Sequence, residues 1–346
     1  MKKARLTIAL LALTCAVGSL SCAWAQTPAE KPKLNVAILI FEGVQIIDYT
    51  GPYEVLGSWR KRNVYTVAEK SDAITTNMGM RVVPNYTFAN QPRPDILIIP
   101  GGGVKQHLDN PAVIKWIQES AAQAKYVMSV CNGAFFLAKA GLLNGLEATT
   151  TAGLIESLKR AAPKTKVVTD KRFVDNGKII TAAGLSAGID GALHLIEKLD
   201  GKGWAQVIAY GIEYNWQPDS GFARAALADM VLPSSIYEPF YASAEPLSIT
   251  GGRDDWEEKW SVASTSSPAE MLQRINEKWV AEAKWSKDDS VKASSGSVMA
   301  SRWKFTDNQG RAWKTTVSVE PLAEKDHLLV TLEIARGERA ARAQVK

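Results

Sequence analysis

Cys131 is the residue whose surroundings most clearly indicate chemistry. It follows a short apolar run, Tyr126–Val130, that is typical of a buried parallel strand, and it precedes a predicted helix over Ala134–Ala140. Ser129 and Gly133 are small enough for the sharp strand-to-helix turn that presents a nucleophile. The amides at the start of that helix would favour a thiolate and lower the pKa of the cysteine. The alternative is that Cys131 has no chemical role and packs in the core as a small hydrophobic residue.

Three groups could support a nucleophile at Cys131. The backbone N–H of Gly102 or Gly103, together with that of Asn132, could stabilise developing negative charge, although a glycine run could equally be a tight turn. Asp48 is expected just past a strand end, on the same edge of the sheet. It could share a proton with the thiol, which would raise the pKa of the carboxyl and lower that of the thiol. On its spacing alone it could also cap a helix.

The histidines offer little support for Cys131. The sequence holds three, His107, His194 and His327. His194 is expected inside a helix as a satisfied interior residue, and His107 in a loop or at the surface. No two of them have metal-ligand spacing, and one cysteine cannot make a zinc site, so no metal or other cofactor is predicted.

The first 25 residues predict a secretory signal peptide. Three basic residues precede an apolar run over 6–17, and a small-x-small sequence places cleavage after Ala25. A lipoprotein signal at Cys22 fits less well, because Ser19 stands where that motif has leucine. The sequence therefore predicts a periplasmic or secreted protein.

Cleavage after Ala25 changes the charge and the cysteine content. Loss of the three basic residues lowers the formal net charge from +5 to +2, and no basic block remains that would favour nucleic acid. Two of the three cysteines are lost as well, which leaves Cys131 without a disulfide partner in an oxidising compartment. An unpaired thiol kept there, at risk of oxidation, favours a functional role.

Strands alternate with helices between residues 34 and 245. Apolar strands are predicted at Leu34–Phe41 and Asp95–Ile99, a helix is predicted to begin at Gly51-Pro52, and Asn176-Gly177 predicts a hairpin turn. This alternation predicts a doubly wound, mostly parallel α/β sheet after a short linker over 26–33. In such a sheet the functional residues meet at the carboxyl ends of the strands.

Residues 246–346 are predicted to form a second, small α+β domain. A helix is expected over Pro268–Trp285, followed by alternating strands at Ser301–Thr306, Ala312–Val319 and Leu328–Ile334. The tryptophans of this region could offer a stacking platform for a ligand, but the size of the domain favours a role in its core. They are Trp256, Trp260, Trp279, Trp285, Trp303 and Trp313.

Four motifs in residues 34 to about 225 resemble a known family. They are Ile-Leu-Ile-Phe-x-Gly-Val-x-x-x-Asp48-x-x-Gly-Pro-x-Glu-Val, Ile-Ile-Pro-Gly-Gly-Gly, Val-Cys131-Asn-Gly-Ala-Phe and Ala-Gly-x-Ser-Ala-Gly-Ile-Asp190. Together they resemble the ThiJ/PfpI superfamily of class I glutamine-amidotransferase-like proteins, in particular the branch with isonitrile hydratases and the amidase-like halves of AraC-type regulators. The resemblance implies a flavodoxin-like fold, Cys131 as nucleophile, Asp48 as its acidic partner, and an oxyanion site from Gly102 and the Asn132 amide.

Thr151 is a departure from that pattern. Many relatives have a histidine at this position, beside the cysteine, so a Cys–His dyad is absent unless His107 or a partner chain supplies one. This disfavours hydrolysis of peptides or amides, in which a leaving amine must be protonated. Hydration or isomerisation could proceed with a cysteine and one carboxylic acid. Asn132 stands where related hydratases have threonine, so the substrate does not carry over.

The sequence therefore predicts an exported, cysteine-dependent enzyme that acts on a small electrophile such as an isonitrile or a reactive carbonyl compound. Cys131 and Asp48 would be catalytic, and Gly102, Gly103, Asn132 and Thr151 would surround the substrate. The competing hypothesis is a non-catalytic binding or redox-sensing protein in which the cysteine oxidises reversibly. A small molecule is the expected partner, with no nucleic acid, no membrane segment after cleavage, and a homodimer left open.

Overall fold

Long apolar runs form the centre of a seven-stranded sheet. This computed structural model describes residues 33–60, 62–282, 285–288 and 298–337, so the predicted signal peptide lies outside the described residues. The strand order is β10-β11-β7-β6-β1-β2-β5, and every neighbouring pair is parallel except β10 and β11. The strands are β1 (Leu34–Leu39), β2 (Arg62–Ala68), β5 (Tyr86–Thr87), β6 (Ile96–Ile99), β7 (Tyr126–Val130), β10 (Phe173–Asp175) and β11 (Ile179–Ala182).

The helices of this domain pack in two groups. In the first, α1 (Ile46–Gly57) and α6 (Lys202–Gly211) both pack on α5 (Ala187–Asp200). In the second, α2 (Pro111–Gln123) and α4 (Ile155–Ala161) both pack on α3 (Ala134–Lys139). The two short sheets β3–β4 (Ile74–Thr75, Arg81–Val82) and β8–β9 (Glu147–Ala148, Lys166–Val167) lie outside the main sheet. The predicted doubly wound α/β sheet is confirmed.

The order of the strands reverses between β1 and β6. The chain passes from β1 outward to β2 and β5, and then returns to place β6 on the other side of β1. Loops that follow the two strands at such a point diverge and leave a crevice at the carboxyl edge of the sheet. The loops after β1 and β6 are joined there by a β-bridge between Val44 and Gly102.

Helix α1 begins five residues earlier than the sequence analysis predicts. It runs from Ile46, so Pro52 lies inside the helix rather than at its start, and Asp48 lies in its first turn. Proline cannot donate a backbone hydrogen bond, but its fixed φ is compatible with a helix, and the apolar residues before it extend the helix backwards. The earlier start matters because it fixes Asp48 on a regular element.

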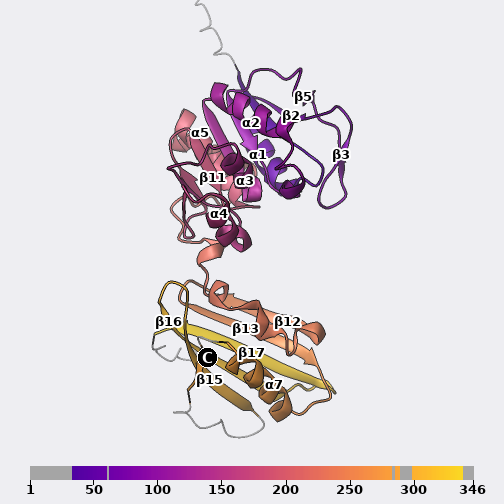
Figure 1. The fold of residues 1–346 in the computed structure, drawn as a ribbon, viewed down its shortest axis with the longest axis vertical. Coiled ribbons are helices and arrows are strands. Elements are labelled where there is room, and N and C mark those ends of the chain that lie inside the picture. The colour runs from indigo at the N-terminus through magenta and orange to yellow at the C-terminus, as the bar shows by residue number, and fades with distance from the viewer. Residues whose placement is uncertain (1–32, 61, 283–284, 289–297, 338–346) are drawn as a thin grey trace, which may run out of the picture.

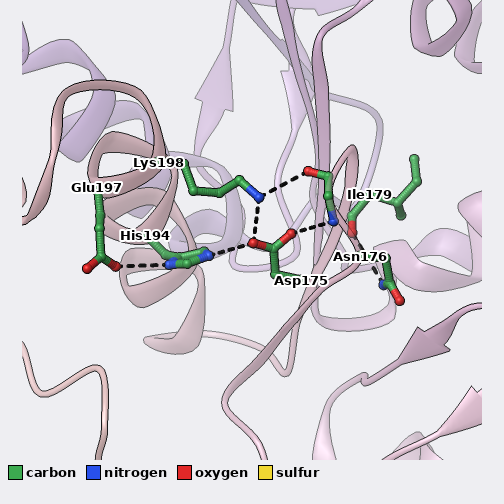
Figure 2. Close-up of polar contacts among 7 residues, drawn as sticks. Asp175, Asn176, Ile179, His194, Glu197 and Lys198 are labelled. Carbon is green, nitrogen blue, oxygen red and sulfur yellow. Dashed lines mark hydrogen bonds and ion pairs between the residues drawn. The ribbon is translucent and has the colours of Figure 1, made fainter.

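The predicted hairpin at Asn176-Gly177 is confirmed, and Figure 2 shows how it is attached to α5. The Asp175 carboxylate lies 2.8 Å from Nε2 of His194 and accepts a hydrogen bond from Nζ of Lys198 at 2.6 Å. The other ring nitrogen of His194 faces Glu197 at 3.1 Å. His194 is therefore a satisfied structural residue, as the sequence predicts.

A second domain contains a six-stranded antiparallel sheet, drawn below the α/β domain in Figure 1. Its strand order is β12-β13-β17-β16-β15-β14, and α7 packs on β14, β15 and β16. Ser267 and Glu270 form a capping box at the start of α7. The elements are β12 (Ala244–Gly251), β13 (Asp255–Ala263), α7 (Pro268–Val280), β14 (Trp285–Lys287), β15 (Met299–Thr306), β16 (Ala312–Pro321) and β17 (His327–Arg336).

Two expectations for this domain are corrected. Helix α7 ends at Val280, and Trp285 instead begins β14. The boundary at Pro246 falls inside β12, and Ile236 and Phe240, which lie upstream of it, belong to the core of the C-terminal domain. Composition changes only where the strands begin, so it misses the 3₁₀ turns that already pack on this core.

The tryptophans of the C-terminal domain lie mainly in its core. Trp279, Trp303 and Trp313 are at most 2 % exposed, and Trp260 is also buried. The ring of Trp279 meets that of Trp303 edge to face, with centroids 5.9 Å apart. The preference for a core role over a stacking platform is therefore confirmed. No helix among the described ranges is long and apolar enough to cross a membrane.

Removal of the Trp303 ring tests this assignment. We expect Trp303→Ala to lower the free energy of unfolding by roughly 3–5 kcal/mol, because the substitution leaves a cavity in the core. Urea unfolding followed by circular dichroism measures the change. Trp204→Ala, at a position 47 % exposed on α6, is the matched control and should change stability by less than about 0.5 kcal/mol. An equally small effect of Trp303→Ala would contradict the core role.

Candidate active site

Cys131 lies on a strained turn between β7 and α3. Its φ is +58°, a left-handed conformation that is unusual for a residue with a side chain, and a 3₁₀ turn over Cys131–Gly133 follows. A Cβ on Gly133 would lie 2.1 Å from the carbonyl oxygen of Ile99, so only glycine fits there. Ser129 is fully buried between neighbouring strands. The turn therefore requires glycine at position 133, as the sequence predicts, while Ser129 is a small residue buried within β7.

Asp48 meets Cys131 at the reversal of strand order. Its carboxyl is fully buried beside the Cys131 side chain, and each group shifts the pKa of the other. Oδ2 accepts a hydrogen bond from the Gly101 amide at 3.2 Å, and Oδ1 accepts one from the Leu185 amide at 3.0 Å. The loops after β6 and β11 therefore hold the carboxyl from two sides. The cysteine and the carboxyl predicted from sequence are brought together.

The backbone amides of the glycine loop after β6 have other hydrogen-bond partners than the prediction requires. The Gly102 amide donates to Oδ1 of Asn132 at 2.7 Å, and Nδ2 of Asn132 donates to the Gly102 carbonyl at 2.8 Å. The Gly103 amide donates to the Gly43 carbonyl at 2.8 Å. Neither glycine amide is free to hold an oxyanion in this arrangement. Their role is corrected to a structural one, because both are engaged in holding the loops together.

Two other donors reach the sulfur. The backbone N–H of Asn132 and the hydroxyl of Thr151 both form hydrogen bonds with Cys131. The hydroxyl of Thr150 donates to the Cys131 carbonyl at 2.9 Å, which fixes the backbone of the turn beside them. Gly184 packs so closely that a Cβ there would lie 3.3 Å from Cα of Cys131. Thr151 thus occupies the place beside the sulfur, at the position where relatives were expected to carry histidine.

Burial and mutual charge set the protonation of the pair. Burial raises the pKa of Asp48 from 3.8 to about 6, and the two backbone amides only partly offset it. Burial, followed by the negative charge of Asp48, raises the pKa of Cys131 from 9.0 to about 12. Because one charge opposes the second, the pair holds a single negative charge at neutral pH. With Asp48 ionised, the resting cysteine is a thiol.

The predicted lowering of the cysteine pKa is therefore wrong. Helix α3 has only six residues and follows a 3₁₀ turn, so it presents a small dipole to the sulfur. The hydrogen bonds from Asn132 and Thr151 do favour the thiolate, but burial and the Asp48 carboxylate outweigh them. The pKa of Asp48 is raised, as predicted, but burial is the cause, and the contact with Cys131 itself lowers that pKa. A thiolate forms here when the thiol proton passes to Asp48.

The histidines do not replace the missing dyad partner. Nε2 of His107 lies 2.9 Å from the Glu42 carbonyl oxygen, and its ring packs on Phe41 with centroids 4.9 Å apart. His194 belongs to the hairpin attachment described above, and His327 lies in the C-terminal sheet. Across the described ranges, no three His, Cys, Asp or Glu side chains gather as metal ligands.

Leu185 is the site residue that sequence reasoning missed. It contributes its backbone amide, which no residue type reveals, and its φ of +51° is again left-handed. The only signal was its position between Gly184 and Ser186, in a motif that begins a helix after β11.

The fold and the site together define a class of proteins: an α/β sandwich with a cysteine on a strand-to-helix turn and a buried acidic partner. Comparison with known proteins finds relatives of the same class. Residues 34–198 match the DJ-1/PfpI family. The isonitrile hydratase of Pseudomonas putida is 36% identical over 219 residues, which cover 62% of this chain and 91% of that protein. The chain belongs to the DJ-1/PfpI family.

Other relatives share the same domain in different settings. A THiJ/PfpI family protein from Pseudomonas syringae has a crystal structure with a TM-score of 0.51 and 28% identity, covering 60% of this chain and 85% of that one. The HTH-type transcriptional regulator GbdR of Pseudomonas aeruginosa is 23% identical over 181 residues, which cover 51% of this chain and 49% of the regulator. The α/β domain is thus the part that these relatives share with this chain.

The raised pKa of Asp48 predicts a pH-dependent stability. Between pH 3.8 and about 6 the folded state binds more protons than the unfolded state, so the free energy of unfolding falls as the pH rises through this window. The shift corresponds to roughly 3 kcal/mol. We expect urea unfolding to show a larger loss of stability between pH 4 and pH 7.5 in the wild type than in Asp48→Asn, by about this amount.

An exposed carboxylate supplies the control for this measurement. Asp109, whose side chain is 90% exposed in a surface ion pair with Lys139, is replaced by asparagine in the same way. Asp109→Asn should retain the wild-type pH dependence. If Asp48→Asn and the wild type lose the same stability over this range, the buried carboxyl does not titrate as described.

Proposed function

We propose that this chain is a cysteine-dependent hydratase acting on a small electrophile, with isonitriles as the first candidate class and reactive carbonyl compounds as the second. The observation that carries the proposal is the buried Asp48 carboxyl, held by the Gly101 and Leu185 amides beside Cys131, where each group shifts the pKa of the other. The 36% identity to an isonitrile hydratase, over nearly the whole of that protein, supports the substrate class. A pair that shares one proton can both activate the sulfur and protonate the substrate.

The reaction with an isonitrile balances with this pair and water alone. The thiol proton passes to Asp48 as the sulfur attacks the terminal isonitrile carbon, and the new carboxylic acid gives the same proton to that carbon. A C–S bond and a C–H bond form, which yields a thioimidate on Cys131. Water then adds to the thioimidate carbon, and its protons pass to nitrogen and to the departing sulfur. The C–S bond breaks, and a formamide and the free thiol are released.

The donors around the sulfur fit the charges in this sequence. The Asn132 amide and the Thr151 hydroxyl hydrogen-bond the sulfur and favour its anionic form, both during attack and when the C–S bond breaks. No amine leaves the substrate carbon in a hydration, so a histidine acid is not required. This distinguishes the proposed reaction from amide hydrolysis, which Thr151 in place of histidine disfavours.

Activity assays test the assignment directly. The purified protein is incubated with aliphatic isonitriles and, separately, with 2-oxoaldehydes, and product formation is followed by NMR. We expect formamide from the isonitriles, no turnover by Cys131→Ala, and a loss of about 100-fold or more in kcat/KM for Asp48→Asn, which cannot carry the proton. Thr151→Val should have a smaller effect, because it removes one of the two donors.

His107→Gln is the matched control for a proton carrier outside the pair. His107 contacts a backbone carbonyl rather than Cys131, so this variant should keep wild-type kcat/KM. Turnover that survives in Cys131→Ala would overturn the mechanism. A large loss of kcat/KM in His107→Gln would show that the histidine, and not Asp48, carries the proton. Failure of both substrate classes with a folded wild type would remove the proposed activity.

We propose in addition that the protein is exported and cleaved after Ala25, on the basis of the basic and apolar pattern of its first residues. Expression of the whole sequence in a Gram-negative host should give a periplasmic product whose intact mass begins at Gln26. A product that retains Met1 and stays with the cytoplasmic fraction would contradict this.

A further inference from the structure

The amide of Leu185 is held in place by a strained backbone. Leu185 has φ of +51°, and its N–H donates to Oδ1 of Asp48 at 3.0 Å. A left-handed leucine is costly and persists only where neighbouring groups fix it. The residue is 47 % exposed and so contributes little packing of its own. Something other than Leu185 must hold this turn.

Arg172 contacts the turn on both sides of Leu185. Its carbonyl oxygen accepts a hydrogen bond from the Ala183 amide at 2.7 Å, at the end of β11. Its guanidinium donates to Oγ of Ser186 at 3.0 Å, on the residue that immediately follows Leu185. The same guanidinium bonds Oδ2 of Asp190 at 2.6 Å. One side chain therefore connects the turn to the first turn of α5.

Asp190 orients the guanidinium. Its side chain is 5% exposed in the ion pair and that of Arg172 is 17% exposed, so the contact is largely shielded from water. The hydroxyl of Tyr214 also donates to the Asp190 carboxylate, at 3.1 Å from Oδ1. The ring of Phe222 lies 5.5 Å from the guanidinium carbon. With these contacts the fork of Arg172 has one orientation, which a lysine could not reproduce.

We propose that Arg172, Asp190 and Ser186 form a positioning device that keeps the Leu185 amide on Asp48 and so controls where the proton shared with Cys131 resides. The hydrogen bonds of Arg172 go to the turn and to α5, so these residues act on Asp48 through the backbone of the turn. The proposal rests on the catalytic pairing of Asp48 and Cys131 proposed above. It concerns the carboxyl itself, so it can be tested without turnover.

The direction of the effect follows from the hydrogen bond. The Leu185 amide stabilises the ionised carboxylate and lowers the pKa of Asp48. The carboxyl is faced by Cys131 from the turn after β7 and by the Gly101 amide from the loop after β6. Burial, these two amides and the thiol set its pKa, with no charged side chain among the causes. Loss of the Leu185 amide should raise the pKa of Asp48 and move the shared proton towards the carboxyl.

The test is a titration of Asp48 in the whole folded protein. Carbon-13 NMR of labelled aspartate carboxyls follows the titration, and the Asp48 resonance is assigned by its absence in Asp48→Asn. We expect Ser186→Ala and Arg172→Lys to move the midpoint upward by roughly half a pH unit or more. The rate of Cys131 alkylation near neutral pH should rise in the same variants, because a protonated Asp48 favours the thiolate.

Two comparisons make the result decisive. Arg224→Met breaks an Arg–Asp ion pair with Asp229, outside this network, and should leave the midpoint unchanged. Ser186→Ala keeps every charge, so its shift separates positioning from a through-space effect of Arg172. If the midpoints of folded Ser186→Ala and Arg172→Lys are unchanged, the proposal is wrong. It is also wrong if the midpoint shifts only in Arg172→Met, which removes the positive charge. The titration is readable in a protein with no hydratase activity, so a failed assay and a failed positioning role are distinguishable.

Discussion

One buried negative charge, shared between Asp48 and Cys131, is the constraint on which this site depends. The carboxyl is fully buried, and the two groups cannot both ionise easily at neutral pH. Such a charge is tolerated only with fixed hydrogen-bond donors around it. The loops after β6, β7 and β11 supply these donors through their backbone amides. Two residues of these loops, Cys131 and Leu185, have a left-handed backbone. Local strain is thus offset by the stabilisation of this charge.

The sequence was sufficient to find the two reacting groups. Cys131 was marked by small residues at fixed spacing, and Asp48 by its place after a strand at the same sheet edge. Both signals are side-chain identities, which a sequence displays. The other parts of the site are backbone amides whose partners depend on tertiary geometry. The engagement of Gly102 by the Asn132 side chain and the donation by Leu185 could not be inferred from residue types. The sign of the cysteine pKa failed for a related reason, since it depends on burial.

The fold shows the same difference between features that local patterns determine and features that depend on tertiary packing. Apolar runs and the Asn176-Gly177 turn predicted the parallel sheet and its hairpin because local patterns determine them. The sequence misplaces the start of α1, because a Gly-Pro pair favours the first turn of a helix, whereas Pro52 lies inside this one. Strands β12 and β13 went unpredicted, because β12 has no buried residue and the charged run Glu257–Lys259 interrupts the alternation in β13, with Glu258 on the buried face. In both cases tertiary packing overrode the local signal.

The surroundings of Cys131 differ in how far their side chains can be substituted. The Asn132–Gly102 contact constrains both of its residues, whereas the Leu185 contact does not constrain its side chain. The loops after β6 and β7 are joined by two hydrogen bonds, so neither can change without disturbing the turn that carries the sulfur. On the other side, Leu185 binds Asp48 through its backbone N–H, and nearly half of the residue is exposed. That side chain is free to vary among residues that accept a left-handed backbone. A change of side chain at position 185 therefore leaves the amide on Asp48 in place, whereas a change at Asn132 or Gly102 disturbs the turn itself.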